Sequence, residues 1–96
     1  MITRIVKLHF HQNQAKLFPP VFARVSEQIL KYPGCRSLDM LQDVDNPAIY
    51  FTISTWDHLL ALEHYRRSEL FKQVWPEVKA WFAFPADAWT LQNVSS

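Results

Sequence analysis

The segment from Tyr50 to Trp75 constrains the fold of this chain more than any other part of the sequence. It begins with the alternating residues of a strand that ends at Trp56, and Asp57 is a suitable cap for a helix that follows directly. Ser68 can cap a second short helix. This order places a large aromatic side chain at the end of a strand, opposite two short helices. We therefore expect a small apolar chamber between these helices and a sheet.

The length and the composition predict one domain with a partner. The chain has 96 residues, and we expect residues 1–96 to form a single domain. A chain of this length buries only about 60% of the surface that it exposes when unfolded. Hydrophobic residues nevertheless make up 49% of the sequence, and aromatic residues 15%. Because a monomer hides so much apolar surface poorly, we expect a symmetric homodimer.

Charge, glycine content and hydropathy exclude several classes of function. The net charge is +1 and the longest run of like charges is Arg66–Arg67, so no basic stripe suits a nucleic acid. Gly34 is the single glycine, whereas phosphate-binding loops and dinucleotide fingerprints need several. No apolar run is long enough to span a membrane. Cys35 is the single cysteine, which excludes an internal disulfide and favours a reducing, cytoplasmic location.

The predicted elements follow the order βαββαβ, with the second helix broken in two. The main helix is expected from Pro19 or Pro20 to Lys31, because proline is tolerated in a first helical turn. Pro76 should kink or interrupt the last helix. This order is typical of a ferredoxin-like α+β fold, an antiparallel sheet with helices on one face. The expected strands are Ile2–His11, Cys35–Gln42, Ala48–Trp56 and Ala86–Val94.

Both faces of the third strand are predicted to be buried. Successive residues of a strand point to opposite faces of the sheet, and neither face of this strand carries a charge. We expect the helices to cover one face and a second subunit's sheet to cover the other. One face of the strand carries Ile49, Phe51 and Ile53, and the opposite face carries Tyr50, Thr52, Ser54 and Trp56.

Four segments of the chain resemble the antibiotic-biosynthesis-monooxygenase family. They are YPGC (Tyr32–Cys35), FTISTW (Phe51–Trp56), ALEHYRRSELFKQVW (Ala61–Trp75) and PADAWTL (Pro85–Leu91). The resemblance implies a dimeric α+β barrel built from ferredoxin-like protomers. It also implies an activity from one of two branches, one that forms quinones without a cofactor and one that degrades haem.

The quinone-forming branch uses an Asn and a Trp near the end of the third strand, and a Tyr on the following helix. Trp56 matches the Trp of that branch. Thr52 takes the position of the Asn and Leu62 that of the Tyr, with Tyr65 about one turn further on. The haem-degrading branch has a Trp on the helix and a His after an FK-like pair. This chain has Tyr65 at the position of the Trp and Trp75 at the position of the His, so the haem-binding His is missing. The resemblance therefore disfavours haem oxygenation, and we expect no cofactor.

Four aromatic side chains and one hydroxyl are the candidate substrate-binding residues. Aromatic walls provide apolar contact and stacking for a planar phenolic substrate. The alternative is that the same side chains are only core, as aromatic residues at helical spacing usually are. The candidates are Thr52, Trp56, Tyr65, Phe71 and Trp75.

Histidines are the candidate bases, because their charge changes near neutral pH. His9 and His11 share one face of the first strand, and His64 lies on a predicted helix. With Glu63 they could instead hold a metal, although we expect no metal. A third possibility is haem binding without degradation, with His9 or His64 as the ligand. Four cationic residues could hold an anionic substrate oxygen or could simply be solvated: Arg4, Lys7, Arg66 and Arg67.

The sequence thus predicts a cofactor-independent monooxygenase that oxidises a phenol, a quinol or an anthrone with O2. The expected catalytic residues are His9, His11, His64 and Trp56: a histidine removes the phenolic proton, and Trp56 positions the ring. The alternative is a non-enzymatic dimeric protein, stress-related or binding a small molecule, which the departures at Thr52 and Leu62 favour.

Overall fold

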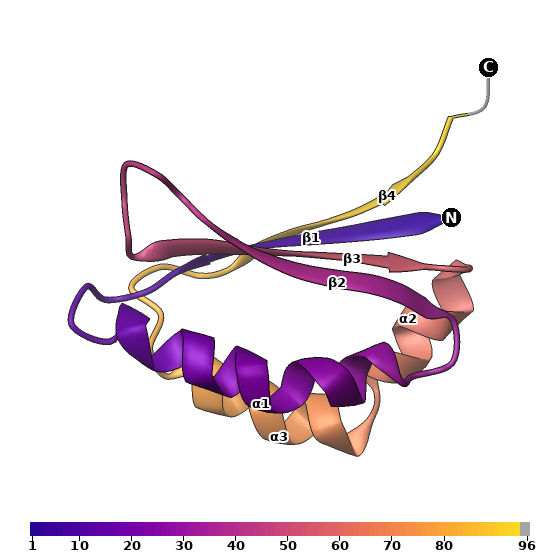
Figure 1. The fold of residues 1–96 in the computed structure, drawn as a ribbon, viewed down its shortest axis with the longest axis horizontal. Helices are drawn as coiled ribbons and strands as arrows, with labels where there is room; N and C mark the ends of the chain where they lie inside the picture. The colour runs from indigo at the N-terminus through magenta and orange to yellow at the C-terminus, as the bar shows by residue number, and fades with distance from the viewer. Residues whose placement is uncertain (95–96) are drawn as a thin grey trace.

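Helices cover one face of a four-stranded antiparallel sheet in the computed structural model, which describes residues 1–94 (Figure 1). The strand order is β2-β3-β1-β4, and the elements confirm the predicted ferredoxin-like arrangement. Ser95 and Ser96 of the predicted domain lie outside the described residues. The elements are β1 (Ile2–His9), a 3₁₀ turn η1 (Ala15–Leu17), α1 (Phe18–Leu30), β2 (Cys35–Gln42), β3 (Ile49–Trp56), α2 (Leu59–Arg66), α3 (Glu69–Lys79) and β4 (Asp87–Gln92).

β1 lies inside the sheet, between β3 and β4, and it pairs with both in the antiparallel sense. In this register Ile5 is opposite Ile53 on one side and opposite Trp89 on the other. The alternation predicted for β3 is confirmed, because Tyr50 and Trp56 are buried beneath the helices. Residues of even number on β1 and β3 therefore face the helices, and those of odd number face away.

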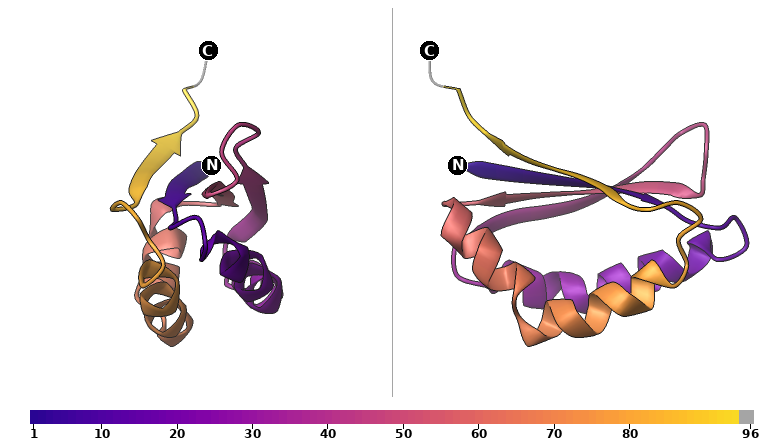
Figure 2. Two further views of the ribbon diagram at one scale, coloured as in Figure 1. Left: turned by 90° about the vertical axis from the view of Figure 1, so that its left-hand side faces the viewer. Right: turned by 180° about the vertical axis from the view of Figure 1, so that it is seen from behind.

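The other face of the sheet is not covered by any described element, as both views in Figure 2 show. It is strongly apolar along its middle. The exposed fractions of Leu41, Trp89 and Leu91 are 52%, 45% and 46%. The apolar side chains on this face, called the open sheet face below, are Ile5, Leu41, Phe51, Ile53, Trp89 and Leu91.

The buried side chains between the sheet and the helices form two clusters. One surrounds Phe10, Phe18 and Tyr50, whose rings lie 5.1 to 6.0 Å apart between centroids. The other surrounds Trp56 and Leu62, the first of which is completely buried. Each cluster joins one end of α1 to one end of the sheet, so the space between them is where a cavity can form.

The cap of α2 is His58, so the prediction of Asp57 is wrong. His58 has the extended backbone of a cap, and its Nδ1 accepts a 3.3 Å hydrogen bond from the amide of Ala61. The side chain of Asp57 instead accepts two hydrogen bonds from Arg36, of 2.6 and 3.0 Å. Its amide donates to the carbonyl of Gly34 at 2.8 Å, which ties Asp57 to the preceding turn and moves the helix start one residue along the chain.

Several details of the predicted elements differ from the structure, β4 (predicted as Ala86–Val94) among them, and three of these differences have a local reason. α1 begins at Phe18, because both prolines then lie in the first turn, where amides have no helical partner. α3 continues through Pro76, so of the two predicted effects, a kink or an interruption, the interruption does not occur. Proline removes only one helical hydrogen bond, and the carbonyl of Pro76 still accepts one from Ala80 at 3.2 Å. β1 ends at His9, because the next residue pairs only as an isolated bridge with the segment after α3.

Gly34 allows the chain to turn tightly from α1 into β2. Its φ is +86°, in the region that favours glycine. A Cβ at this position would lie 2.5 Å from the Cβ of Ala61 on α2. The turn therefore passes directly against the second helix. Within residues 1–94, no helix is long and apolar enough to cross a membrane.

Candidate functional site

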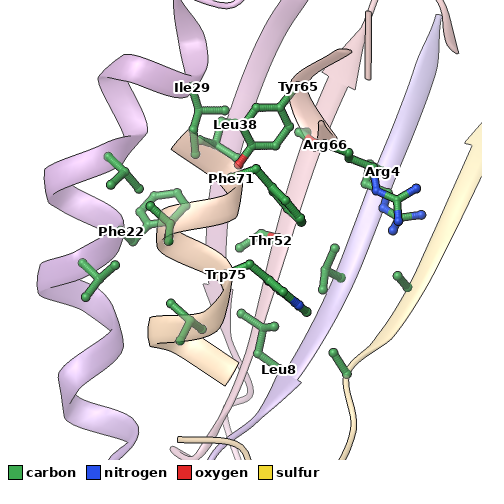
Figure 3. Close-up of a pocket in the computed structure, with 18 of the residues that line it drawn as sticks. Arg4, Leu8, Phe22, Ile29, Leu38, Thr52, Tyr65, Arg66, Phe71 and Trp75 are labelled. Atoms are coloured by element: carbon green, nitrogen blue, oxygen red, sulfur yellow. The ribbon is translucent and has the colours of Figure 1, made fainter. Parts of the chain in front are cut away.

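A cavity of about 280 Å³ lies between α1, the α2–α3 pair and the sheet (Figure 3). α1 supplies one wall, α2 and α3 the opposite wall, and the helix-facing side of the sheet the floor. On the outer surface, Arg24 of α1 and Glu77 of α3 form a 2.7 Å ion pair that joins the two walls. The lining residues are Arg4, Val6, Leu8, Phe18, Val21, Phe22, Val25, Ile29, Leu38, Thr52, Ser54, Trp56, Tyr65, Arg66, Phe71, Val74, Trp75, Val78, Ala86 and Ala88.

The wall from α2 and α3 is a continuous series of aromatic rings. Trp56 and Tyr65 stack with centroids 5.4 Å apart, and Tyr65 meets Phe71 edge-on at the same distance. Phe71 and Trp75, one turn apart on α3, stack almost in parallel at 5.7 Å and 9°. Such a wall offers both ring faces and ring edges to a flat ligand.

The five residues predicted to bind substrate all lie on the cavity lining. Tyr65, Phe71 and Trp75 come from the helices, and Thr52 from β3, as Figure 3 shows. All four are partly exposed, whereas Trp56 is not exposed at all. The core interpretation therefore applies to Trp56, which is packed beneath the cavity. The binding interpretation applies to the other four residues, which border open space.

The polar atom of Trp56 is already used within the protein. Its Nε1–H donates a 2.9 Å hydrogen bond to Oγ of Ser54, which lies on the same side of β3. Because this bond is buried, the indole N–H is not available to orient a ligand. Trp56 thus supports the stacked ring of Tyr65 rather than holding a ligand by its own hydrogen bond.

Tyr65 carries a phenol that stays protonated at neutral pH. Burial raises the pKa of Tyr65 well above its ordinary value, and the neighbouring Tyr32 and Cys35 act in the same direction. The hydroxyl can therefore donate a hydrogen bond to a ligand but does not serve as a base near neutral pH. Burial likewise raises the pKa of the Cys35 thiol, which is not on the lining.

None of the three predicted histidines lines the cavity. His9 lies on the same side of the sheet as the open sheet face, and its ring is 4.7 Å from that of Phe84. His11 is exposed just after β1, and His64 is exposed on α2. No group of three or more His, Cys, Asp or Glu residues suited to a metal ion occurs among residues 1–94.

The structure instead brings two of the four candidate cations to the cavity. Arg4 projects from the floor, and Arg66 projects from the end of α2 (Figure 3). Lys7 has the opposite parity on β1 and faces away, and Arg67 is not on the lining. Arg4 is two residues from Val6 on the strand, so the two share a face, whereas Lys7 is on the opposite face. This alternation was the sequence signal that could have distinguished Arg4 from Lys7.

Much of the lining was not predicted as site residues, including one wall and part of the floor. Val21, Phe22 and Val25 of α1 form the wall opposite the aromatic series. Their helical spacing predicts a face laid on a core, but it does not tell a packed face from a cavity wall. Ala86, directly before β4, and Ala88, near the start of β4, leave room at the floor because their side chains are small.

The fold and the cavity define a class, the ferredoxin-like α+β proteins with an apolar chamber between helices and sheet. The sequence profile of the family described as "Antibiotic biosynthesis monooxygenase" matches residues 1–76. This chain belongs to that family, which confirms the resemblance seen in its sequence. No curated protein shows significant sequence similarity to the chain.

Solved structures with the same fold cover nearly the whole chain. A crystal structure of an antibiotic biosynthesis monooxygenase is 19% identical, has a TM-score of 0.91 and aligns over 99% of this chain and 100% of its own. A conserved protein from Methanosarcina mazei Go1 is 21% identical over 98% and 94% of the two chains, with a TM-score of 0.91. Rv0793 from Mycobacterium tuberculosis is 15% identical over 99% and 96%, with a TM-score of 0.89. These similarities show the common fold.

Proposed function

We propose that this protein is a cofactor-independent monooxygenase that oxidises a small electron-rich aromatic compound, such as a phenol, a quinol or an anthrone, with O2. The observation that carries the proposal is the cavity of about 280 Å³ with its aromatic wall, in a chain of this family. Apolar contact and stacking together favour a planar aromatic ligand in such a space.

In this reaction the substrate itself supplies the electrons. The deprotonated substrate passes one electron to O2, and the substrate radical and superoxide then combine to form a C–O bond. Loss of water leaves one oxygen atom as a new carbonyl, while the other departs with two hydrogens of the substrate. The cavity would hold the ring in one orientation and shield the radical pair from bulk water.

The proton that leaves the substrate needs an acceptor. His9 faces away from the cavity and His11 lies beyond β1, so neither is placed to contact a ligand there. His64 lies on α2, directly before the lining residues Tyr65 and Arg66, although its own side chain is exposed. We therefore propose His64, acting through water, as the remaining histidine base, and His64→Gln tests it through the pH dependence of the rate.

Oxygen uptake by chelator-treated protein, measured with a panel of anthrones and dihydroxyarenes, tests the activity. We expect uptake above the spontaneous rate, and a loss of this excess in Phe71→Ala. Leu60→Ala is the control, because Leu60 is 66% exposed and is not on the lining. A rate equal to that of buffer across the panel and across pH would contradict the proposal.

A second candidate, a non-enzymatic binding protein of the same fold, is favoured by one observation. Leu62, which takes the position of a Tyr in the quinone-forming branch, is 1% exposed and packs in the cluster around Trp56. This position therefore offers no hydroxyl to a ligand, and Thr52 replaces the Asn of that branch. Ligand-dependent quenching of tryptophan fluorescence without oxygen consumption would support this candidate.

We propose further that two copies of the chain pair through the open sheet face. Members of this family commonly form dimers, and the open sheet face presents large apolar side chains that no described element covers. Burying them against an identical face would remove this surface from water. The mass of the protein in solution, by sedimentation or light scattering, tests this assembly.

A further inference from the structure

Two arginines are the only charged residues among the described lining of the cavity, and no carboxylate lines it. Arg4 lies on the floor, on the same side of β1 as Val6 and Leu8. It is opposite Ser54 and Thr90 in the sheet. Arg4 is only partly buried, so it loses part of its hydration, and partners must compensate for that part. The identity of those partners therefore indicates what the site is built to hold.

The hydrogen bonds of Arg4 within the protein leave most of its donors free. Its Nη1 donates to Oγ1 of Thr90 at 2.6 Å, which fixes the guanidinium but brings no negative charge. Burial and the nearby Arg66 lower the pKa of Arg4, and Glu63 acts in the opposite direction. The like charge of Arg66 adds repulsion to the cost of burial.

Arg66 is only weakly compensated. Its Nη1 lies 3.5 Å from Oε1 of Glu63, at the long end of an ion pair, and both side chains are substantially exposed. Figure 3 shows the side chains of Arg4 and Arg66 converging at one end of the cavity, away from Phe71 and Trp75. The cavity thus has an apolar aromatic part and a cationic end.

We propose that Arg4 and Arg66 bind an anionic oxygen of an aromatic ligand, a carboxylate or a phenolate, while the ring lies along Phe71 and Trp75. This inference rests on the proposed use of the cavity for an aromatic substrate. Guanidinium groups suit such oxygens, because their N–H donors form charge-assisted hydrogen bonds in a planar fork. For a phenolic substrate, the two positive charges would favour the ionised form, which is the form that reduces O2. The arginine pair would then lessen the need for a histidine base at this site.

Binding of matched probes tests the carboxylate arm. The probes are 2-naphthoate and its neutral isostere 2-naphthamide, titrated by quenching of tryptophan fluorescence, since Trp56 and Trp75 line the cavity. We expect 2-naphthoate to bind at least about tenfold more tightly, and Arg4→Met and Arg66→Met each to remove about that factor. Arg67→Met is the control, because Arg67 is adjacent but not on the lining. Binding of 2-naphthamide should be the same in all four proteins, which shows that the cavity is intact.

The phenolate arm uses 4-nitrophenol, whose ionised form is visible by absorbance. We expect its apparent pKa to fall on binding to the wild type and to Arg67→Met, but not on binding to Arg66→Met. A preference for the anion in either arm supports the proposal and identifies which oxygen is bound. Three outcomes would overturn it. One is equal affinity for 2-naphthoate and 2-naphthamide together with an unshifted pKa of 4-nitrophenol. The others are equal effects of Arg66→Met and Arg67→Met, and no binding of any probe. Anion binding without oxygen uptake would retain this inference and reject the monooxygenase.

Discussion

The side chains of Trp56 and Ser54, two residues apart on β3, are joined by a 2.9 Å hydrogen bond from the indole Nε1–H to the serine Oγ. Trp56 is fully buried and Ser54 is 8% exposed. A buried indole N–H normally finds a partner, and here the same strand provides it. The bond fixes the ring on which Tyr65 stacks, and so it sets the deep end of the aromatic wall.

Removing the acceptor of this bond should destabilise the protein. In Ser54→Ala the indole N–H stays buried without a partner, and we expect the free energy of unfolding to fall by about 1–3 kcal/mol. Urea unfolding followed by tryptophan fluorescence measures the change. Ser26→Ala is the control, because the Ser26 hydroxyl makes only a 3.5 Å contact with a carbonyl of its own helix. Equal stability of the two variants would show that Trp56 does not depend on Ser54.

Gly34 should tolerate no side chain while Ala61 is present. Gly34→Ala adds a Cβ only 2.5 Å from the Cβ of Ala61, at a φ of +86°, and we expect a loss of at least about 2 kcal/mol. The same change in an Ala61→Gly background should cost less, because the clash is gone and only the backbone strain remains. The four proteins of this cycle can be compared by urea unfolding. An equal cost in both backgrounds would mean that the contact with Ala61 is unimportant.

The titration of Tyr65 should make the protein less stable in alkaline solution. Folding raises the pKa of Tyr65, so the folded protein favours the neutral phenol. The contribution of this phenol to the free energy of unfolding is fully present below the ordinary pKa of 10.0 and is lost as the pH rises above that value. The stability of Tyr65→Phe should therefore decrease less steeply than that of the wild type above this pH. Phe71→Leu is the control: it alters the same aromatic cluster without removing a titrating group, and it should keep the steeper wild-type dependence.

A charge on the open sheet face should separate the proposed dimer. Trp89 is 45% exposed and lies opposite Ile5 in the sheet, so Trp89→Asp would place a carboxylate within the apolar surface. We expect a dimeric mass for the wild type by light scattering and a monomeric mass for the variant. Leu60→Asp, which adds the same charge on α2, should stay dimeric. A monomeric wild type would contradict the proposed assembly.

Most of the fold could be predicted because its signals are local. The bounds of β2 were predicted without error, and β3 began only one residue later than expected. The cap of α2 was assigned to Asp57 instead of His58, since either side chain can cap a helix. The choice between them depended on the ion pair of Asp57 with Arg36, twenty-one residues away in the chain. Pro76 shows the same limit, because a single lost hydrogen bond did not end a helix held by its packing.

The candidate site was predicted only in part. The aromatic residues could be placed on the cavity because their spacing puts them on the inner faces of helices and strands. The histidines could not, because a residue type suited to proton transfer says nothing about where the chain places it. His9 shows this most simply: it shares β1 with Arg4, but its odd number turns it to the opposite face.

The sequence alone determined the order of the elements, the two faces of β3 and the aromatic character of the chamber, because periodicity and turn residues act over a few neighbouring positions. The tertiary structure decided which charges reach the cavity. Arg4 and Arg66 come close together there because β1 lies inside the sheet beside β3, and α2 packs against β3. Strand order and helix placement depend on the packing of the whole chain, so no local sequence pattern predicts that Arg4 and Arg66 lie close together.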